Sequence, residues 1–332
     1  MREKFESDLI CPIEKSKFIK INKNYFISKK HKYPIISGIP CLYVDGKLNS
    51  NNKKTQFVKK FYMKNPFPNY NEFDNVKIFC EKAKKGVFVK LLSEQIGTQK
   101  KILEIGCGTG QLSNYLSATT FSNKIYATDI SLNSLKLANK FKNLNNLIDV
   151  NFFQMNLFHP CFRKNSMDIV ISNGVLHHTY NPFKAFQEIT SLVKPDGYII
   201  ISLYNYLGRL ITKFNKLLYK MFGEKGLLFD TYIKNKISKE KKKAWMQDQY
   251  NHPLESTHSF NEVINKWFKN NKITFISSIP KVVGDFSEKE KLFEKNNHGD
   301  IVDKFNTEFE MIVDHKISEG GLFTVIGKKI IK

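Results

Sequence analysis

A glycine-rich turn between a short apolar strand and a helix carries the first residues that could do chemistry. Residues 101–110 read Lys-Ile-Leu-Glu-Ile-Gly-Cys-Gly-Thr-Gly, so an acidic residue, Glu104, precedes three closely spaced glycines. Glycines let a ligand approach the backbone closely, and the free N–H groups of the following helix favour electron-rich ligand groups. A second acidic residue, Asp129, ends the next apolar segment, where a carboxylate can accept both hydroxyls of a ribose. The pattern predicts a site for an adenosyl ligand.

The motif Glu104-Ile-Gly-Cys-Gly-Thr-Gly110, followed by Asp129, resembles the first two motifs of class I S-adenosylmethionine-dependent methyltransferases, in the branch that acts on small molecules (types 11 and 12). It fits the G-x-G-x-x-G loop of nicotinamide dehydrogenases poorly. The resemblance covers residues 101–204 and implies S-adenosyl-L-methionine as the cofactor. It also implies an α/β fold, with a Rossmann-like sheet of seven strands and helices on both faces. The cofactor-binding residues that it implies are Glu104, Gly106, Cys107, Gly108, Gly110, Asp129, Ile130, Asn156, Leu157, Asn173 and Val175.

One of these residues departs from the family pattern. Asn156 stands where many relatives have an aspartate that contacts the adenine amino group. An asparagine side-chain oxygen can accept the same hydrogen bond. Asn156 therefore stays in the predicted cofactor site.

Two histidines follow the fourth predicted strand, at the sheet edge where ligands bind. The segment Leu176-His177-His178 resembles the fourth motif of the same methyltransferase branch. Methyl transfer to a hydroxyl or ammonium group needs a base with a pKa near the operating pH, and histidine suits that task. We therefore consider His177 and His178 as candidate catalytic residues. The alternative is that His177 lines the methionine end of the cofactor and that His178 packs.

A second cluster of polar residues lies in the segment from Asp248 to His258. Its density of polar side chains predicts a substrate-binding loop, with Tyr250 and His252 as further candidate catalytic residues. The spacing of His252, Glu255 and His258 could be taken for a metal site, but no helical context supports it. We predict no metal there, and a solvated loop is the alternative.

Strand and helix patterns alternate from residue 101 to residue 204, which predicts a parallel sheet covered on both faces. Ser131 and Asn181-Pro182 are expected to begin two of the helices, and Ser259 with Glu262 forms a capping box. Segments 272–278 and 321–327 resemble the reversed final hairpin of the class I fold. The five predicted regions are residues 1–46, 47–100, 101–204, 205–258 and 259–332, the last being the C-terminal part of the catalytic domain.

Residues 1–46 resemble the small zinc-ribbon-like protein that serves as a partner subunit of several methyltransferases. The usual Cys-Pro-x-Cys pair is reduced to Cys11-Pro12-Ile13-Glu14, and a second cysteine pair is missing. Cys11 and His31 alone cannot supply the four ligands of tetrahedral zinc. We predict a degenerate, β-rich ribbon without metal that acts as a packing or docking element, with no protein partner identified.

Two further segments are expected to surround the core. Polar residues 47–56 indicate a linker, and residues 61–70, with prolines amid aromatics, indicate either an aromatic lip over the substrate pocket or a loop packed on the catalytic domain. Apolar residues recur at helical spacing from Leu207 to Met221, with lysines largely opposite. This helix of the insertion is interpreted as a lid, and contact with a membrane surface is the alternative.

Composition limits the function classes. The chain has 332 residues, 41% of them hydrophobic, and five scattered cysteines that argue against a disulfide scaffold. It has no signal-peptide pattern and no apolar run of the roughly 20 residues that span a membrane, so a cytoplasmic enzyme is expected. The net charge of +22 invites a nucleic-acid interpretation. Specific binding is nevertheless the less favoured interpretation, because the lysines are spread over the whole chain, as an AT-rich genome would produce.

These observations predict an enzyme that uses S-adenosylmethionine to methylate an O or N atom of a small metabolite, or of a carrier-linked or glycan intermediate. An RNA-modifying methyltransferase is the alternative, supported by the charge and by the N-terminal resemblance. A non-catalytic adenosyl-binding scaffold is a second alternative. It fits poorly because the glycine loop and Asp129 are intact.

Overall fold

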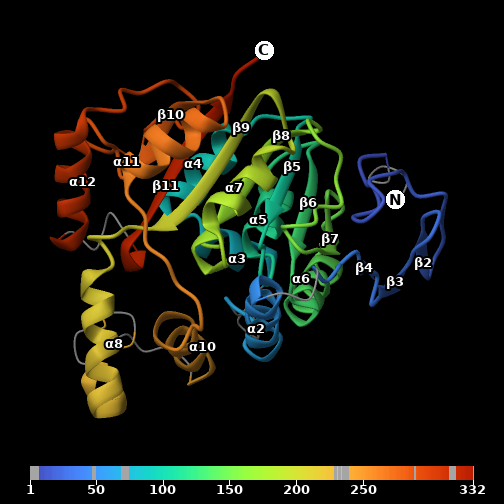
Figure 1. The fold of residues 1–332 in the computed structure, drawn as a ribbon, viewed down its shortest axis with the longest axis horizontal. Helices are drawn as coiled ribbons and strands as arrows, with labels where there is room; N and C mark the ends of the chain where they lie inside the picture. Colours follow the sequence, from blue (N-terminus) through green and yellow to red (C-terminus); the bar gives the residue numbers. More distant parts are fainter. Residues whose placement is uncertain are drawn as a thin grey trace.

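The computed structural model describes residues 7–46, 50–68, 75–227, 230, 233, 239–287, 289–313 and 319–331. Its centre is a seven-stranded sheet of order β10-β11-β9-β8-β5-β6-β7 (Figure 1). Only β11 runs antiparallel to its neighbours within this sheet, so the predicted seven-stranded fold with a reversed final hairpin is confirmed. The strands are β5 (Lys101–Ile105), β6 (Lys124–Asp129), β7 (Val150–Gln154), β8 (Met167–Asn173), β9 (Val193–Tyr204), β10 (Ile273–Ile279) and β11 (Leu322–Lys329).

Helices cover both faces of this sheet, because its central strands are apolar on both sides. Alternate residues of β5 enter different cores: Leu103 belongs to the core that contains Phe186 and Trp267, whereas Ile102 belongs to the core that contains Leu91 and Leu116. The helices are α2 (Ser50–Lys64), α3 (Val76–Ala83), α4 (Val87–Gln95), α5 (Gln111–Thr119), α6 (Leu132–Leu144), α7 (Pro182–Thr190), α8 (Leu210–Phe222), α10 (Lys239–Tyr250), α11 (Phe260–Glu262), which continues as a π-helical turn (Val263–Phe268), and α12 (Ile301–Val313). Short 3₁₀ turns occupy Leu176–His178, Gly223–Leu227 and Glu319–Gly321.

The predicted helix starts have the expected local chemistry. The side chain of Ser131 accepts a hydrogen bond from the N–H of Ser134 and begins α6. Asn181 accepts one from the N–H of Lys184, directly before Pro182 in the first turn of α7. These caps satisfy backbone donors that a helix leaves free, and they fix where each helix leaves the sheet edge.

The N-terminal module forms a separate four-stranded antiparallel sheet that packs against the catalytic sheet. Asp8, which is fully buried, pairs with Lys101 (2.7 Å) and Arg163 (3.2 Å) and accepts a hydrogen bond from Tyr126. The module is therefore tied to the start of β5 by charge as well as by apolar contact. Its resemblance to a zinc ribbon stays a prediction. Its strands are β1 (Lys20–Ile21), β2 (Tyr25–Ile27), β3 (Lys32–Ile36) and β4 (Ile39–Pro40).

Three local predictions need correction. The predicted linker is helical from residue 50, because α2 runs through it and ends at Lys64; residues 69 and 70 of the predicted lip lie outside the described residues. Asp248 to Tyr250 close helix α10 and do not belong to a loop. The apolar side chains of α8 that were expected to cover the core lie largely at the surface. Among the described helices, none is long and apolar enough to pass through a bilayer.

Candidate active site

A cavity of about 650 Å³ opens at the carboxyl ends of β5, β6, β8 and β9, and residues of α2 and α10 form its other wall. Ligands bind at this edge of parallel α/β sheets because strand ends and helix starts converge there. Ten of the eleven predicted cofactor residues line the cavity: Glu104, Gly106, Cys107, Gly108, Asp129, Ile130, Asn156, Leu157, Asn173 and Val175.

Gly110, the remaining predicted residue, acts through packing. It does not line the cavity, and it precedes α5 with a φ of +74°. A Cβ at this position would lie 2.7 Å from both Ala138 and Phe152. Gly110 therefore lets the loop turn while α6 and β7 press against it.

Gly108 and Gly106 hold the loop close to its neighbours on either side. A Cβ on Gly108 would lie 2.3 Å from the carbonyl oxygen of Phe67, and one on Gly106 would lie 2.3 Å from the side chain of Val175. The loop is therefore enclosed between the segment after α2 and the end of β8. Phe67 and Pro68 line the cavity at this point and also pack on the loop, so the aromatic lip over the substrate stays a prediction.

Two buried carboxyl groups border the loop. Asp129 accepts hydrogen bonds from the backbone N–H groups of Gly108 (2.8 Å) and Ser131 (2.7 Å), and Glu104 accepts one from the Ser113 hydroxyl. Burial raises the pKa of Glu104 to about 7 and that of Asp129 to about 6. In the described parts of the chain, no ion pair involves either carboxylate.

Asn156 lines the cavity with its side chain already engaged. Its oxygen accepts a hydrogen bond from the N–H of Phe158 (3.1 Å), and its amide nitrogen donates to the carbonyl of Val44 (3.1 Å). Val44 belongs to the N-terminal module, so Asn156 links that module to the cavity. Its predicted contact with an adenine amino group stays a prediction.

Of the four candidate catalytic residues, the structure places only His178 in the cavity wall. Its Nδ1 lies 2.8 Å from the carbonyl oxygen of Leu254, so this nitrogen carries the proton in the neutral ring and Nε2 is left as an acceptor. Burial lowers the pKa of His178 to about 3. The ring is therefore neutral at pH 7 and can accept a hydrogen bond, but it is a weak base.

The other three candidates lie behind the cavity wall. His177 is fully buried and stacks on Tyr204 with 3.8 Å between ring centroids, and its Nδ1 accepts a hydrogen bond from the Tyr204 N–H. The His252 ring lies against that of His178 in a tilted arrangement, with 3.7 Å between ring centroids. Tyr250 donates its hydroxyl hydrogen to Asp230. All three side chains therefore contact neighbouring residues and do not line the cavity.

A carboxyl group from α10 also lines the cavity. Asp248 Oδ1 accepts a hydrogen bond from the Tyr62 hydroxyl (3.2 Å), and its Oδ2 accepts one from Gln249 Nε2 (2.8 Å). Tyr62, Trp245, Asp248 and Gln249 all line the cavity. Burial raises the pKa of Asp248 to about 6, although the hydrogen bond from Tyr62 and the nearby Arg209 charge oppose this rise.

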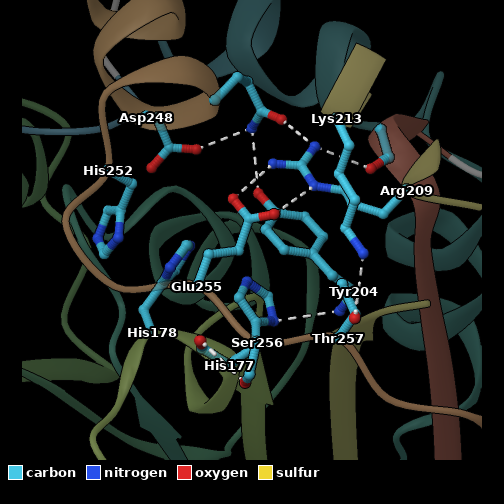
Figure 2. Close-up of polar contacts among 12 residues, drawn as sticks. His177, His178, Tyr204, Arg209, Lys213, Asp248, His252, Glu255, Ser256 and Thr257 are labelled. Carbon is cyan, nitrogen blue, oxygen red and sulfur yellow. Dashed lines mark hydrogen bonds and ion pairs between the residues drawn. The ribbon is translucent and has the colours of Figure 1, made fainter. Parts of the chain in front are cut away.

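The fully buried Arg209 organises this end of the cavity (Figure 2). Its Nε and Nη2 each lie 3.1 Å from a different oxygen of Glu255, its Nη1 donates to Gln249 Oε1 (2.5 Å), and its guanidinium covers the Tyr204 ring at 3.7 Å. Because Arg209 takes the amide oxygen of Gln249, the NH₂ group must face Asp248. A planar five-donor fork can make all of these contacts at once.

Residues 103–201 match the family described as "Methyltransferase domain". They contain the glycine loop, the carboxyl groups of Glu104 and Asp129 that border it, and the paired histidines. The chain carries a class I S-adenosylmethionine-dependent methyltransferase domain. The predicted family and cofactor are therefore confirmed for this part of the molecule.

Curated relatives match only a part of this chain. An uncharacterised protein of Synechococcus is 26% identical over 205 residues, 55% of this chain and 49% of the relative. The mitochondrial ubiquinone biosynthesis O-methyltransferase of Dictyostelium discoideum is 27% identical over 45% of this chain and 47% of its own. Mouse mitochondrial arginine-hydroxylase NDUFAF5 is 32% identical over 31% and 28%. The chain spans about half, or less, of these curated relatives.

A solved structure shares the fold. PKMT2 from Rickettsia typhi superimposes with a TM-score of 0.50 and 15% sequence identity, covering 78% of this chain and 54% of that one. At this identity the likeness concerns the fold alone. It includes more of the chain than the domain match, in agreement with strands β10 and β11 completing the sheet.

The cavity of the methyltransferase domain suits S-adenosylmethionine chemically. The ligand carries a ribose, an α-ammonium group and a sulfonium. Asp129 and Glu104 offer carboxylate oxygens to such donors and cations, and the described chain provides them with no cation of its own. Their raised pKa values show that the site, without a ligand, disfavours these negative charges. A cationic ligand would relieve that cost.

The possible metal ligands that lie close together in the structure are not the ones whose sequence spacing could be taken for a metal site. In the second polar cluster, Glu255 pairs with Arg209 and His258 lies 3.1 Å from Glu262, so the His252, Glu255 and His258 side chains do not converge. In the N-terminal module, Cys11, Glu14 and His31 lie within 4.8 Å of one another. Glu14 stands where a zinc ribbon has its second cysteine. It is a third possible metal ligand, beside the Cys11 and His31 that the sequence interpretation considered.

Sequence reasoning missed Tyr204 and Arg209, which lie at the end of the cavity that also holds Asp248, whereas Tyr62 belongs to the predicted aromatic segment 61–70. One signal for Arg209 was available. The chain contains 50 lysines and only three arginines. In so lysine-rich a sequence, an arginine marks a position where a planar, multidentate cation is needed and a lysine would not serve.

Proposed function

We propose that the chain transfers the methyl group of S-adenosylmethionine to an oxygen or nitrogen of a small or carrier-linked acceptor, with Asp248 as the general base. When bound, the cofactor supplies an electrophilic methyl group on a sulfonium. The observation that carries the proposal is the hydrogen-bonded group of Asp248, Tyr62 and Gln249 in the wall of the same cavity that the glycine loop lines.

Asp248 is better suited than His178 to take the acceptor's proton. A base works best when its pKa lies near the operating pH. The pKa of Asp248 is raised to about 6, whereas that of His178 is lowered to about 3, so the carboxylate is the stronger base of the two and is still ionised at pH 7. His178 Nε2 is free to accept a hydrogen bond that orients the acceptor.

The aromatic lining supports an acceptor of limited size. Tyr62, Phe67, Trp245 and Tyr180 contribute to one cavity of about 650 Å³, which is within the range of small-molecule sites. α2 and α10 approach each other over it, where Tyr62 meets Asp248. This arrangement favours an enclosed small acceptor over RNA, for which the net charge of +22 and the N-terminal resemblance are the supporting observations.

The name of one relative supports the proposed methyl transfer, and the name of another points to a different reaction. The Dictyostelium relative is named as an O-methyltransferase, in line with a hydroxyl acceptor. The mouse relative is named as an arginine-hydroxylase. A test of function must therefore detect the transferred methyl group itself and not only cofactor binding.

The test incubates the purified chain with methyl-tritiated S-adenosylmethionine and an extract of the source cells. The extract is divided into small-molecule, glycan, lipid, protein and RNA pools. We expect label in the small-molecule or glycan pool, and we expect Asp248→Asn to abolish it while cofactor binding persists. Label confined to RNA would establish the alternative. Tight cofactor binding without label in any pool would contradict the proposed activity.

A further inference from the structure

Helix α8 exposes an apolar stripe that the fold leaves uncovered. Leu210, Phe214, Leu217 and Met221 follow one another at intervals of four, three and four residues, so they lie on one side of the helix. Their exposed fractions run from 41% to 63%. The opposite side holds the helix to the molecule, because Asn215 is buried and Tyr219 packs against Tyr250.

The ends of the stripe are also aromatic and exposed. Tyr206 precedes α8 and is 56% exposed, and Phe222 closes it at 59%. Soluble chains seldom present a continuous apolar surface of this kind unless it contacts something. None of the residues of α8 lines the cavity, so methyl transfer does not account for the stripe.

Three lysines run beside the stripe. Lys213, Lys216 and Lys220 are spaced so that they form a row on one flank, and α8 carries no acidic residue. Lys213 lies 4.8 Å from the ring centroid of Tyr206. A helix with an apolar face and a cationic flank is suited to the interface of an anionic bilayer, where apolar side chains enter the acyl region and lysines meet phosphates.

The position of α8 in the molecule is suited to contact with a flat surface such as a bilayer. Figure 1 shows α8 at the end of the molecule opposite the N-terminal module, beside α12 and clear of the sheet. The start of α8 meets α12 where Gly208 lies against Met311. α12 exposes Ile301, Phe305 and Phe309 but also bears acidic residues, so it adds apolar surface while the attraction to anionic headgroups comes from α8.

We propose that α8 docks the chain on the surface of a bilayer that contains anionic lipids, with Phe214, Leu217 and Met221 inserted among the acyl chains. The protein would lie on the membrane without crossing it, in agreement with the absence of a described helix that could span one. This docking is independent of which acceptor the cavity takes.

The test is flotation of the full chain with vesicles of phosphatidylcholine alone and of phosphatidylcholine with about one quarter phosphatidylglycerol. We expect binding to the anionic vesicles only, reduced at least about tenfold when salt is raised from about 0.05 to about 0.5 M. The double variant Phe214→Asp/Leu217→Asp should lose at least about tenfold of the binding, since it removes two of the inserted side chains. Lys216→Glu/Lys220→Glu should weaken binding to anionic vesicles.

The matched control is Phe121→Asp, which charges an equally bulky residue that is 77% exposed and lies outside α8. It should bind vesicles as the wild type does. Each variant must keep its affinity for S-adenosylmethionine, which shows that it is folded. Absence of flotation with anionic vesicles, or equal flotation of Phe214→Asp/Leu217→Asp, would overturn the proposal. A dimer in light scattering that this variant abolishes, without vesicle binding, would assign the stripe to self-association instead.

Discussion

Glu14 in the N-terminal module and Asp248 in α10 are both carboxyl groups within clusters of titratable side chains, but their surroundings differ. Glu14 accepts hydrogen bonds from the backbone N–H groups of Lys29 (3.2 Å) and Lys30 (2.8 Å), from the Ser28 hydroxyl (2.8 Å) and from His31 Nδ1 (2.8 Å). Within the described residues, Asp248 accepts two hydrogen bonds, from Tyr62 and Gln249, and it faces a cavity.

The difference appears in the two pKa values. The hydrogen bond with His31 is the main reason why the pKa of Glu14 is lowered to about 2. Burial is the main reason why that of Asp248 is raised to about 6. A carboxylate surrounded by donors holds a structure together, whereas one with too few donors retains the capacity to take a proton from a ligand.

The comparison predicts its largest effect for Asp248→Asn. Because asparagine keeps the shape and loses the base, we expect kcat/KM to fall by at least about 100-fold with the affinity for S-adenosylmethionine unchanged. Steady-state kinetics and calorimetry with the cofactor measure the two quantities. Glu14→Gln, the same change in the other cluster, should alter kcat less than about twofold. A fully active Asp248→Asn enzyme would remove Asp248 from the mechanism.

The pH profile is the next test of Asp248. A group whose pKa is raised to about 6 loses its charge as pH falls through 6, so kcat/KM should drop about tenfold per pH unit below that value and level off above it. The charged and titratable groups that act on it are Tyr62, Arg209 and Glu255. His178, with a pKa of about 3, cannot produce this limb. A limb that persists unchanged in residual Asp248→Asn activity would assign it to another group.

A smaller effect is expected for Arg209→Lys, which retains the charge and loses the fork. Without the Nη1 contact the Gln249 amide is free to turn, and Asp248 loses one of its two donors. We expect kcat to fall on the order of tenfold and the acid limb to move above pH 6, because a carboxylate with fewer donors has a higher pKa. A drop in kcat with the limb unmoved would show a role in packing alone.

Glu14→Gln should affect stability and not turnover. The folded pKa of Glu14 lies below its ordinary value of 4.5, so its stabilising contribution is full above pH 4.5 and is lost as pH falls from there toward 2. We therefore expect the variant to have a lower Tm than the wild type at pH 7, with the difference disappearing toward pH 2. Glu294→Gln, at an exposed pair with Lys291, is the control and should leave Tm unchanged. An equal Tm for Glu14→Gln and the wild type would contradict the structural role.

The smallest effect concerns metal. Cys11, Glu14 and His31 lie close enough to share an ion, but donors already surround the Glu14 carboxylate, and Cys11 Sγ lies 3.2 Å from the Tyr33 hydroxyl. We expect added zinc or a chelator to move Tm by less than about 1 °C. Stoichiometric zinc in the purified chain, with a Tm that falls on chelation, would show that the cluster is a metal site after all.

The cofactor end of the cavity could be predicted because its parts are local in sequence. The loop from Glu104 to Gly110 and the residue that ends β6 are placed by two adjacent parallel strands, so type and spacing are enough to bring them together. The alternation of strand and helix patterns likewise predicted the parallel part of the sheet, whereas the seven strands and the reversed final hairpin were implied by the family resemblance.

The end of the cavity that holds Asp248, where we propose that the acceptor binds, could not be predicted in this way. Tyr62 and Asp248 are 186 residues apart, and Arg209 reaches Gln249 across 40 residues. No periodic pattern identifies which polar residue of a lysine-rich helix turns inward, and α10 lacks a clear apolar face. For the same reason His177 and His178 were predicted as candidate catalytic residues and Asp248 was not, although only one of the two histidines lines the cavity. The opposite error concerns α8. Its strong apolar stripe resembles a buried face, but the structure leaves the stripe exposed.

Arg209 immediately precedes α8 and also holds the amide of Gln249, so one side chain joins the surface helix to the acceptor end. Any ligand or surface that shifts this residue acts on both places. Free energies of binding at two linked sites are reciprocal, so an interface that favours one position of α8 must change the affinity for the acceptor, and the acceptor must change the affinity for the interface by the same factor. The membrane docking proposed for α8 would then be coupled to acceptor binding through Arg209.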